Sequence, residues 1–109
     1  MHEIGLVEEV IEIVRQRTGD APIRRVVLEV GALAAVLPDA MRFAFEVCRE
    51  GTPLAGAILD LVETPGLARC RACGAEVRLD RPFGRCTCGN ADLDWMSGEE
   101  LRIREVEVG

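Results

Sequence analysis

The hydrophobic pattern in the first half of the chain changes from a helical period to a strand-like period and back again. One apolar stripe between residues 4 and 17 has the spacing of a helix surface, and its members are Val7, Val10, Ile11 and Val14. Gly19 and Pro22 follow this stripe and end the predicted helix. Residues 25–30 then alternate with period two, which predicts a strand with one mostly buried face.

A second helix is predicted to start at Pro38, because proline is favourable in a first helical turn. Its core-facing stripe again has helical spacing and runs through Leu37, Met41, Ala44, Phe45 and Cys48. Gly51 is expected at the first position beyond this helix. Strands are expected at residues 58–63 and 100–108, the second with a β-bulge near Arg104 because its alternation shifts there by one residue.

Residues 67–96 differ in composition from the rest of the chain. They contain four of the five cysteines and too few large apolar side chains to build a core of their own. Strand patterns lie on both sides of the segment, so we expect a module inserted between two strands of one sheet. We therefore predict two domains, one made of residues 1–66 and 97–109 and the other of residues 67–96.

Charge and segment patterns exclude several classes of protein. The 109 residues include 13 arginines, no lysine and 19 acidic residues, for a net charge of −6. A sequence-independent nucleic-acid binder should be basic, because its affinity comes largely from neutralising phosphates. No apolar run approaches the ~20 residues of a membrane helix, and no secretory signal precedes the first predicted helix. We expect a cytoplasmic protein with neither nucleic acid nor a membrane as its partner.

The residues needed for common catalytic arrangements are also missing. The single histidine is at position 2, so no serine–histidine–aspartate arrangement is expected. There is no glycine-rich phosphate loop with a lysine, and no pair of carboxylates stands out. We predict a protein that is not an enzyme.

The spacing of four cysteines is the clearest chemical signal. Cys70 and Cys73 form one close pair, Cys86 and Cys88 form a second, and 12 residues separate the pairs. Each pair can form a tight turn, and a hairpin can bring both turns around one tetrahedral ion. A glycine follows each pair and lets backbone amides face the sulfurs. Zn(II) is the expected metal, in a structural site whose binding energy folds the module.

Other interpretations of the four thiols stay open at the level of spacing. They could form a redox dithiol system or hold iron in a rubredoxin-like centre. The second pair has one intervening residue and therefore makes a tighter chelate than the first. Cys48 lies on the apolar stripe of the second predicted helix, and we expect it to be a buried free thiol.

The first three residues form a second candidate metal site. The α-amine of Met1, the amide nitrogen of His2 and the His2 imidazole can close two adjacent chelate rings on one ion. Glu3 offers a further amide nitrogen or a carboxylate. This nitrogen-rich donor set suits Ni(II) or Cu(II) better than Zn(II). Protonation of the amine and the imidazole would weaken such a site as pH falls.

Along essentially its whole length, the chain resembles the HypA/HybF family of hydrogenase maturation nickel chaperones. The resemblance is carried by residues 1–3, 26–33, 43–46 and 98–103, together with the four-cysteine module. It implies an α+β fold, in which a small antiparallel sheet flanked by two helices carries the nickel site and a zinc-ribbon-like module is inserted. It also implies that His2, aided by Met1 and Glu3, holds Ni(II) as cargo while the zinc is structural.

The resemblance further implies protein partners. These are a HypB-type GTPase and the large subunit of a [NiFe] hydrogenase, with urease maturation proteins in some organisms. The leading hypothesis is a metallochaperone that binds Ni(II) and delivers it for hydrogenase maturation.

The alternative hypothesis is a zinc-ribbon module that binds nucleic acid or protein and has no nickel role. Its support is the set of five arginines in the module, Arg69, Arg71, Arg78, Arg81 and Arg85. The net charge of −6 and the presence of only three Phe and one Trp in the chain weigh against base stacking on nucleic acid.

Overall fold

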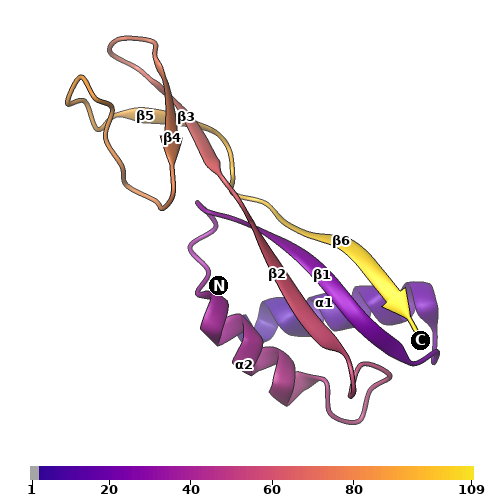
Figure 1. Ribbon diagram of the computed structural model, residues 1–109. Coiled ribbons are helices and arrows are strands. Elements are labelled where there is room, and N and C mark those ends of the chain that lie inside the picture. The colour runs from indigo at the N-terminus through magenta and orange to yellow at the C-terminus, as the bar shows by residue number, and fades with distance from the viewer. Residues whose placement is uncertain (1–2) are drawn as a thin grey trace. The chain divides into compact units, whose positions relative to one another are not determined.

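The computed structural model describes residues 3–109 (Figure 1). The chain forms two compact units, which we name for their contents. The helical unit consists of the described part of Met1–Leu28 together with Val36–Leu61 and Ile103–Gly109. The cysteine unit consists of Glu29–Ala35 and Val62–Arg102. No helix among the described residues is long and apolar enough to cross a membrane.

Two helices of the helical unit pack against each other, α1 (Glu3–Thr18) and α2 (Pro38–Cys48). The predicted stripe of α1 is buried, and its members are Val7, Val10, Ile11 and Val14. At the end of α1, Gly19 has a φ of +63° and donates its N–H to the carbonyl of Arg15 at 2.8 Å, so glycine ends this helix as predicted.

Helix α2 begins as predicted, with Pro38 in its first turn, and buries Met41, Ala44 and Phe45. It ends earlier than expected. Arg49 is the C-cap, and Gly51 (φ +73°) therefore lies one residue beyond the first position outside the helix. A hydrogen bond closes the turn that follows the helix: the Thr52 hydroxyl donates to the Arg49 carbonyl at 2.6 Å.

A three-stranded sheet has the order β2–β1–β6, formed by β1 (Ile23–Gly31), β2 (Ile58–Thr64) and β6 (Leu101–Val108) (Figure 1). The predicted alternation buries Val26, Leu28 and Val30 of β1, and Val27 is buried as well because β1 is the central strand. In β6, residues 104 and 105 are both exposed, as the predicted shift of alternation requires, but Val108 is exposed as well, and the β-bulge stays a prediction.

The second sheet belongs to the cysteine unit and has the order β4–β3–β5. Its strands are β3 (Gly66–Cys70), β4 (Glu76–Leu79) and β5 (Leu93–Ser97), and both pairings are antiparallel. Because these strands fall in the chain between β2 and β6, the cysteine-rich segment is inserted between two strands of one sheet, as predicted. The α+β fold class is confirmed.

The core of the cysteine unit is small. In the register of the sheet, Ala68 lies opposite Val77 on one side and opposite Trp95 on the other. Leu33, Ala68 and Leu79 are buried there, and Val77, Leu93 and Trp95 pack around them. Six residues, only three of them buried, therefore form the hydrophobic cluster of this sheet.

Close backbone approach holds the start of the cysteine unit together. The N–H of Leu33 donates to the Gly98 carbonyl and that of Gly31 to the Glu100 carbonyl, both at 2.8 Å, in an antiparallel pattern. A side chain at Gly31 would collide with the carbonyl oxygen of Gly98. Glycine is required at position 31 because two backbone segments touch there.

Candidate metal centre

The four cysteines of the predicted module lie at one end of the β4–β3–β5 sheet. Cys70 is the last residue of β3, and Cys73 lies in the hairpin that leads to β4. Cys86 and Cys88 lie in the loop between β4 and β5. The Cys70 N–H donates to the carbonyl of Ala75 at 2.9 Å, which closes the hairpin around the first pair. The sheet thus brings together two loops that are distant in sequence.

The sulfur atoms of Cys70, Cys73, Cys86 and Cys88 all lie within 4.8 Å of one another. The Sγ–Sγ distance is 3.7 Å from Cys70 to Cys88 and 3.6 Å from Cys73 to Cys86. Sulfurs bound at the usual ~2.3 Å to one tetrahedral zinc ion lie about 3.8 Å apart. A disulfide would require about 2.05 Å. The geometry therefore fits four ligands of one metal ion and excludes a disulfide in this state.

The two cysteine pairs form similar turns of different length. The N–H of the glycine after each pair donates at 2.9 Å to the carbonyl of the first cysteine of that pair, from Gly74 to Cys70 and from Gly89 to Cys86. Both glycines have positive φ, +74° and +96°. The hydrogen bond spans four residues in the first turn and three in the second, because the second pair has one intervening residue fewer. The shorter spacing is thus accommodated by a tighter turn.

Arginine side chains brace both turns from outside. Arg69 Nη1 donates to the Gly74 carbonyl and Arg85 Nη1 to the Gly89 carbonyl, each at 3.0 Å. Arg71 pairs with Asp92 at 3.2 Å and, more loosely, with an aspartate of β5 at 3.5 Å. Three of the five arginines that could have favoured nucleic acid are therefore engaged within the unit.

Hydrogen bonds from the protein also reach the sulfurs. The Cys73 N–H lies 3.5 Å from Cys70 Sγ, and the side-chain amide of Asn90 donates to the same sulfur at 3.4 Å. The Asn90 bond is the main reason that the pKa of the Cys70 thiol is lowered to about 6. For Cys86, the backbone N–H of Cys88 is the main cause of a lowered pKa. Both effects favour the thiolate, which is the form that binds metal.

Asn90 is a functional residue that our sequence reasoning missed. Its side chain also donates to the Asp92 carbonyl at 3.0 Å, so the amide is held in place beside the sulfur. The Gly89-Asn90 dipeptide indicates only a turn when read from the sequence. Its contact with Cys70 depends on the pairing of β3 with β5, which brings the two loops together.

The four sulfurs differ in exposure. Cys70 and Cys86 are 2% and 5% exposed, whereas Cys73 and Cys88 are exposed to solvent. Each turn therefore contributes one buried and one accessible sulfur. A bound ion would be held by two buried and two exposed cysteines.

Cys48 does not belong to this cluster. It is a free thiol near the end of α2, as predicted, but it is half-buried, and the expectation of a buried thiol is wrong. Its place at the last turn of the helix explains the difference, because the chain leaves the core there. Burial and the nearby Glu8 carboxylate raise the pKa of this thiol.

The N-terminal candidate site lies largely outside the described residues. Met1 and His2 are not described, whereas Glu3 is the first residue of α1. The Glu3 Oε2 atom accepts a hydrogen bond at 3.4 Å from the backbone N–H of Leu37, just before α2. The carboxylate is thus held between the starts of the two helices.

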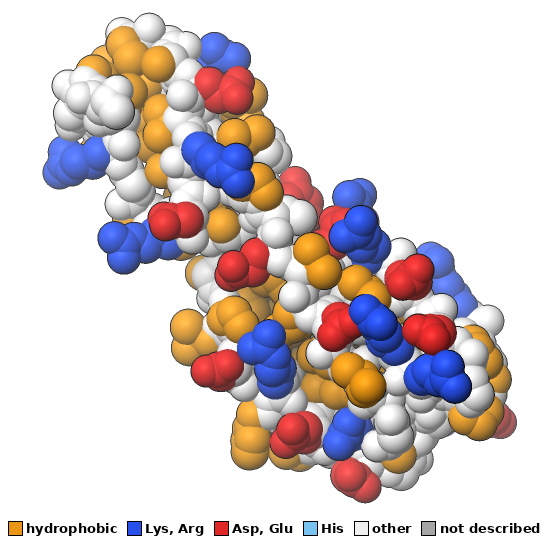
Figure 2. Space-filling view, viewed as in Figure 1, with side chains coloured by type: hydrophobic (Ala, Val, Ile, Leu, Met, Phe, Trp, Pro, Cys, Tyr) orange, Lys and Arg blue, Asp and Glu red, His pale blue; other side chains and the backbone are white. Residues whose placement is uncertain are grey.

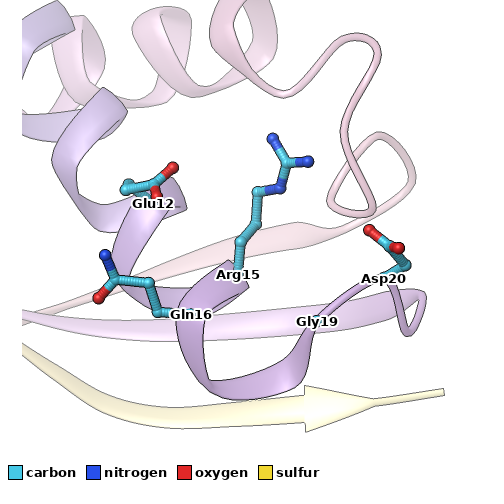
Figure 3. A pocket seen from close by; sticks show the side chains of 5 residues that line it. All are labelled: Glu12, Arg15, Gln16, Gly19 and Asp20. Atoms are coloured by element: carbon cyan, nitrogen blue, oxygen red, sulfur yellow. The ribbon is translucent and has the colours of Figure 1, made fainter.

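Other hollows of the described surface offer no comparable chemistry. One of about 320 Å³ lies at the end of α1, where Arg15 stands between Glu12 and Asp20 (Figure 3). Among residues 3–109, the four cysteines are the only group of three or more Cys, His, Asp and Glu side chains placed to hold one metal ion.

Solved structures show which class of protein has this architecture. The fold is similar to the solution structure of the Ni metallochaperone HypA from Helicobacter pylori, with a TM-score of 0.66 and 26% identity over 99% of this chain and 97% of that one. A second solution structure of a HypA protein matches with a TM-score of 0.62 and 28% identity. This chain therefore has the fold of that class of Ni metallochaperones.

Sequence comparisons identify the family. Residues 1–108 match the family model described as "Hydrogenase/urease nickel incorporation, metallochaperone, hypA". The hydrogenase maturation factors HypA of Trichormus variabilis and Geotalea uraniireducens are 51% and 43% identical to 99% of this chain, which covers 96% and 99% of theirs. The chain belongs to the HypA family of nickel metallochaperones for hydrogenase and urease maturation. The resemblance stated from the sequence and the prediction that the chain is not an enzyme are confirmed.

Proposed function

We propose that this protein binds one Ni(II) ion at Met1, His2 and Glu3, as cargo, and delivers it for [NiFe] hydrogenase maturation. The observation that carries this proposal is the family match over residues 1–108, which includes the Met-His-Glu sequence at its start. The amine, amide and imidazole nitrogens form a donor set that suits Ni(II). We propose accordingly that the domain made of residues 1–66 and 97–109 carries the nickel site and that the domain made of residues 67–96 carries the zinc site.

The position of Glu3 supports a nickel site at the start of α1. The hydrogen bond from the Leu37 N–H orients the Glu3 carboxylate, so less conformational entropy is lost when the carboxylate joins a metal site. A carboxylate in the first helical turn also interacts favourably with the helix dipole and offsets its positive end, which would otherwise disfavour a cation.

We further propose that Cys70, Cys73, Cys86 and Cys88 hold one structural zinc ion. The support is the set of sulfur distances, which match a tetrahedral four-thiolate site, and the preference of Zn(II) for such sites. In this proposal, zinc takes no part in the transfer of nickel. It supplies the folding energy of a unit with a small core.

The proposed partners follow from the role in delivery. They are a HypB-type GTPase, the large subunit of a [NiFe] hydrogenase and, in urease-containing organisms, urease maturation proteins. Delivery takes place in the cytoplasm and involves neither nucleic acid nor a membrane.

Nickel titration of a few variants tests the proposal. We expect the protein to bind about one Ni(II) in addition to its zinc. The His2→Ala variant and a variant with residues fused ahead of Met1 should both lose this nickel and keep their zinc. Cys48→Ser is the control and should keep both metals. Unchanged nickel binding in His2→Ala and in the extended variant would refute the N-terminal site.

The carboxylate can be tested separately. Glu3→Gln retains an oxygen that can accept the Leu37 hydrogen bond but removes the charge, and we expect nickel affinity to fall several-fold. Glu9→Gln, on an exposed turn of the same helix, removes the same charge elsewhere and should leave the affinity unchanged. Equal affinities for the two variants would exclude the Glu3 carboxylate as a ligand.

A further inference from the structure

The exposed sulfurs of Cys73 and Cys88 are the accessible part of the four-thiol cluster. Their partners Cys70 and Cys86 are only 2% and 5% exposed. When the cluster holds zinc, all four sulfurs are thiolates, because a coordinating thiol loses its proton. The susceptibility of a thiolate to oxidation then depends on its exposure. An oxidant that arrives from solvent therefore meets Cys73 and Cys88 first.

Two short sulfur contacts cross from one cysteine-containing turn to the other. The Sγ atoms of Cys73 and Cys86 lie 3.6 Å apart, and those of Cys70 and Cys88 lie 3.7 Å apart. Each contact joins the exposed sulfur of one turn to the buried sulfur of the other. A disulfide bond is about 2.05 Å long, so closing either contact needs a shift of less than about 2 Å. Together the two contacts use each of the four sulfurs once.

The polar side chains that brace the turns do not cover the exposed sulfurs. Arg69 and Arg85 each donate to a backbone carbonyl at 3.0 Å, and Asn90 donates to the buried Cys70 sulfur at 3.4 Å. In Figure 2, in which cysteine shares the orange colour of the hydrophobic side chains, orange atoms reach the surface of the cysteine unit, at upper left, beside arginine side chains. The bracing is therefore directed at backbone carbonyls and a buried sulfur, and the exposed sulfurs keep their access to solvent.

We propose that the cluster is an oxidation site at which hydrogen peroxide attacks the exposed sulfurs and links the two turns by disulfides, Cys73 to Cys86 and Cys70 to Cys88. Zinc leaves the cluster as these bonds form. The proposal rests on the proposed zinc site and requires neither nickel nor a residue of the N-terminus. It gives the two exposed sulfurs a role that a purely structural zinc site does not need.

Each disulfide forms in two steps that pass two electrons from sulfur to peroxide. The exposed thiolate first attacks one oxygen of hydrogen peroxide, the O–O bond breaks, a hydroxide ion leaves, and the sulfur becomes a sulfenic acid. The buried thiolate of the opposite turn then attacks this sulfur, so that the S–S bond forms, the S–O bond breaks and a second hydroxide leaves. Two protons from solvent convert both hydroxides to water. After one disulfide the cluster has two thiolates, too few to complete a four-coordinate zinc site.

Zinc release and peptide mapping test the proposal on the zinc-loaded protein. Hydrogen peroxide is added, a colorimetric indicator follows zinc, and the remaining thiols are blocked with N-ethylmaleimide. We expect about one zinc ion to be released per chain. After removal of peroxide, dithiothreitol should reduce the disulfides and restore zinc binding. Cys48→Ser is the matched control, because it removes the thiol outside the cluster, and it should release zinc at the parental rate.

Trypsin separates the cysteines for mapping, because the chain has no lysine and arginines lie between three of the four positions. The tryptic peptides are residues 70–71 with Cys70, residues 72–78 with Cys73, and residues 86–102 with Cys86 and Cys88. We expect the first two peptides joined to the third and not to each other. Fragmentation of the joined peptides on either side of Thr87 identifies which cysteine of the third peptide is bonded to which partner.

The order of attack can be measured with a trap for sulfenic acid. A brief exposure to peroxide in the presence of dimedone captures the first oxidised sulfur before a disulfide forms. We expect roughly tenfold more adduct on Cys73 and Cys88 than on Cys70 and Cys86. Equal adduct on all four sulfurs would mean that exposure does not direct the reaction.

Three further results would overturn the proposal. The first is a disulfide within a pair, seen as residues 70–71 joined to residues 72–78 or as an internal bond in residues 86–102. The second is a cluster that keeps its zinc and its four thiolates in peroxide. The third is oxidation to sulfinic acid that dithiothreitol does not reverse. A protein that binds no zinc before peroxide is added would refute the zinc site and this proposal with it, so the two failures are distinguishable.

Discussion

The helical unit and the cysteine unit are held together by different forces. Among the described residues, 13 of the buried hydrophobic side chains belong to the helical unit and six to the cysteine unit, and two of those six are cysteines. Apolar burial is the dominant favourable term in folding, and the cysteine unit has little of it. The proposed metal, bound to four thiolates, would replace that term locally and allow a short segment to hold a defined structure inside a larger fold.

The two units also use polar groups differently. In the helical unit, ion pairs such as Arg25 with Asp60 lie on the surface of an already packed structure. In the cysteine unit, side chains of Arg69, Arg85 and Asn90 donate to the carbonyls and sulfur of the metal-binding turns. Polar side chains there hold the cysteine-containing turns in place by hydrogen bonds, because little apolar surface is available for packing.

The largest effect is expected when the proposed zinc site is removed, because only the cysteine unit should then unfold. Cys73→Ser, or removal of zinc with a chelator, should unfold the cysteine unit and leave the helices intact, since metal binding provides about 10–16 kcal/mol in small zinc modules. Zinc content, a red shift of Trp95 emission and unchanged helical circular dichroism are the measurements. Cys48→Ser, which removes the thiol outside the cluster, should bind the parental amount of zinc. A folded cysteine unit in metal-free protein would contradict the comparison.

A cavity in the core of the helical unit should instead destabilise that unit and leave zinc binding by the cysteine unit unchanged. Met41 is completely buried, so Met41→Ala should lower the free energy of unfolding of the helical unit by about 2–5 kcal/mol. Zinc stoichiometry should not change. Thermal unfolding by circular dichroism measures the loss, with Met96→Ala as control because Met96 is half-exposed on β5. Loss of zinc in Met41→Ala would show that the two units do not depend on separate forces.

A smaller effect concerns the pH at which zinc is released. The Asn90 amide lowers the pKa of Cys70 and so favours the thiolate, the form for which metal and protons compete. Asn90→Ala should raise this pKa, and zinc release on acidification should then begin at a higher pH. A colorimetric zinc indicator follows the release during a pH titration. Arg85→Ala removes a hydrogen bond to the second turn without touching a sulfur, so its release midpoint should move less than that of Asn90→Ala.

The smallest effect is expected at the surface of both units. Arg71→Ala in the cysteine unit and Arg25→Ala in the helical unit each remove an exposed ion pair, and each should lower the free energy of unfolding by less than about 1 kcal/mol. Urea unfolding in the presence of zinc measures both. A loss well above this size for Arg71→Ala alone would mean that its aspartate pairs help to hold the metal-binding turns.

Much of the helical unit could be predicted because its signals are local. The stripe from Val7 to Val14 and the alternation around Leu28 each repeat with the period of one element. Strands β3 and β5 were not predicted. They have five residues each, and Arg69 and Asp94 interrupt their apolar character. Their pairing depends on partners far along the chain, which a local pattern cannot contain.

By itself, the sequence determined the two helices, the central strand, the two close cysteine pairs and the family, because periodicity, spacing and motif order are properties of neighbouring residues. Only the tertiary structure decided that Asn90 bonds to Cys70, that one sulfur of each pair is buried, and that Phe83 is held outside against Trp95. The physical reason is that burial and hydrogen bonding depend on which distant segments meet. The local conformational preferences of the residues do not specify which segments come into contact, whereas sheet register and backbone packing do.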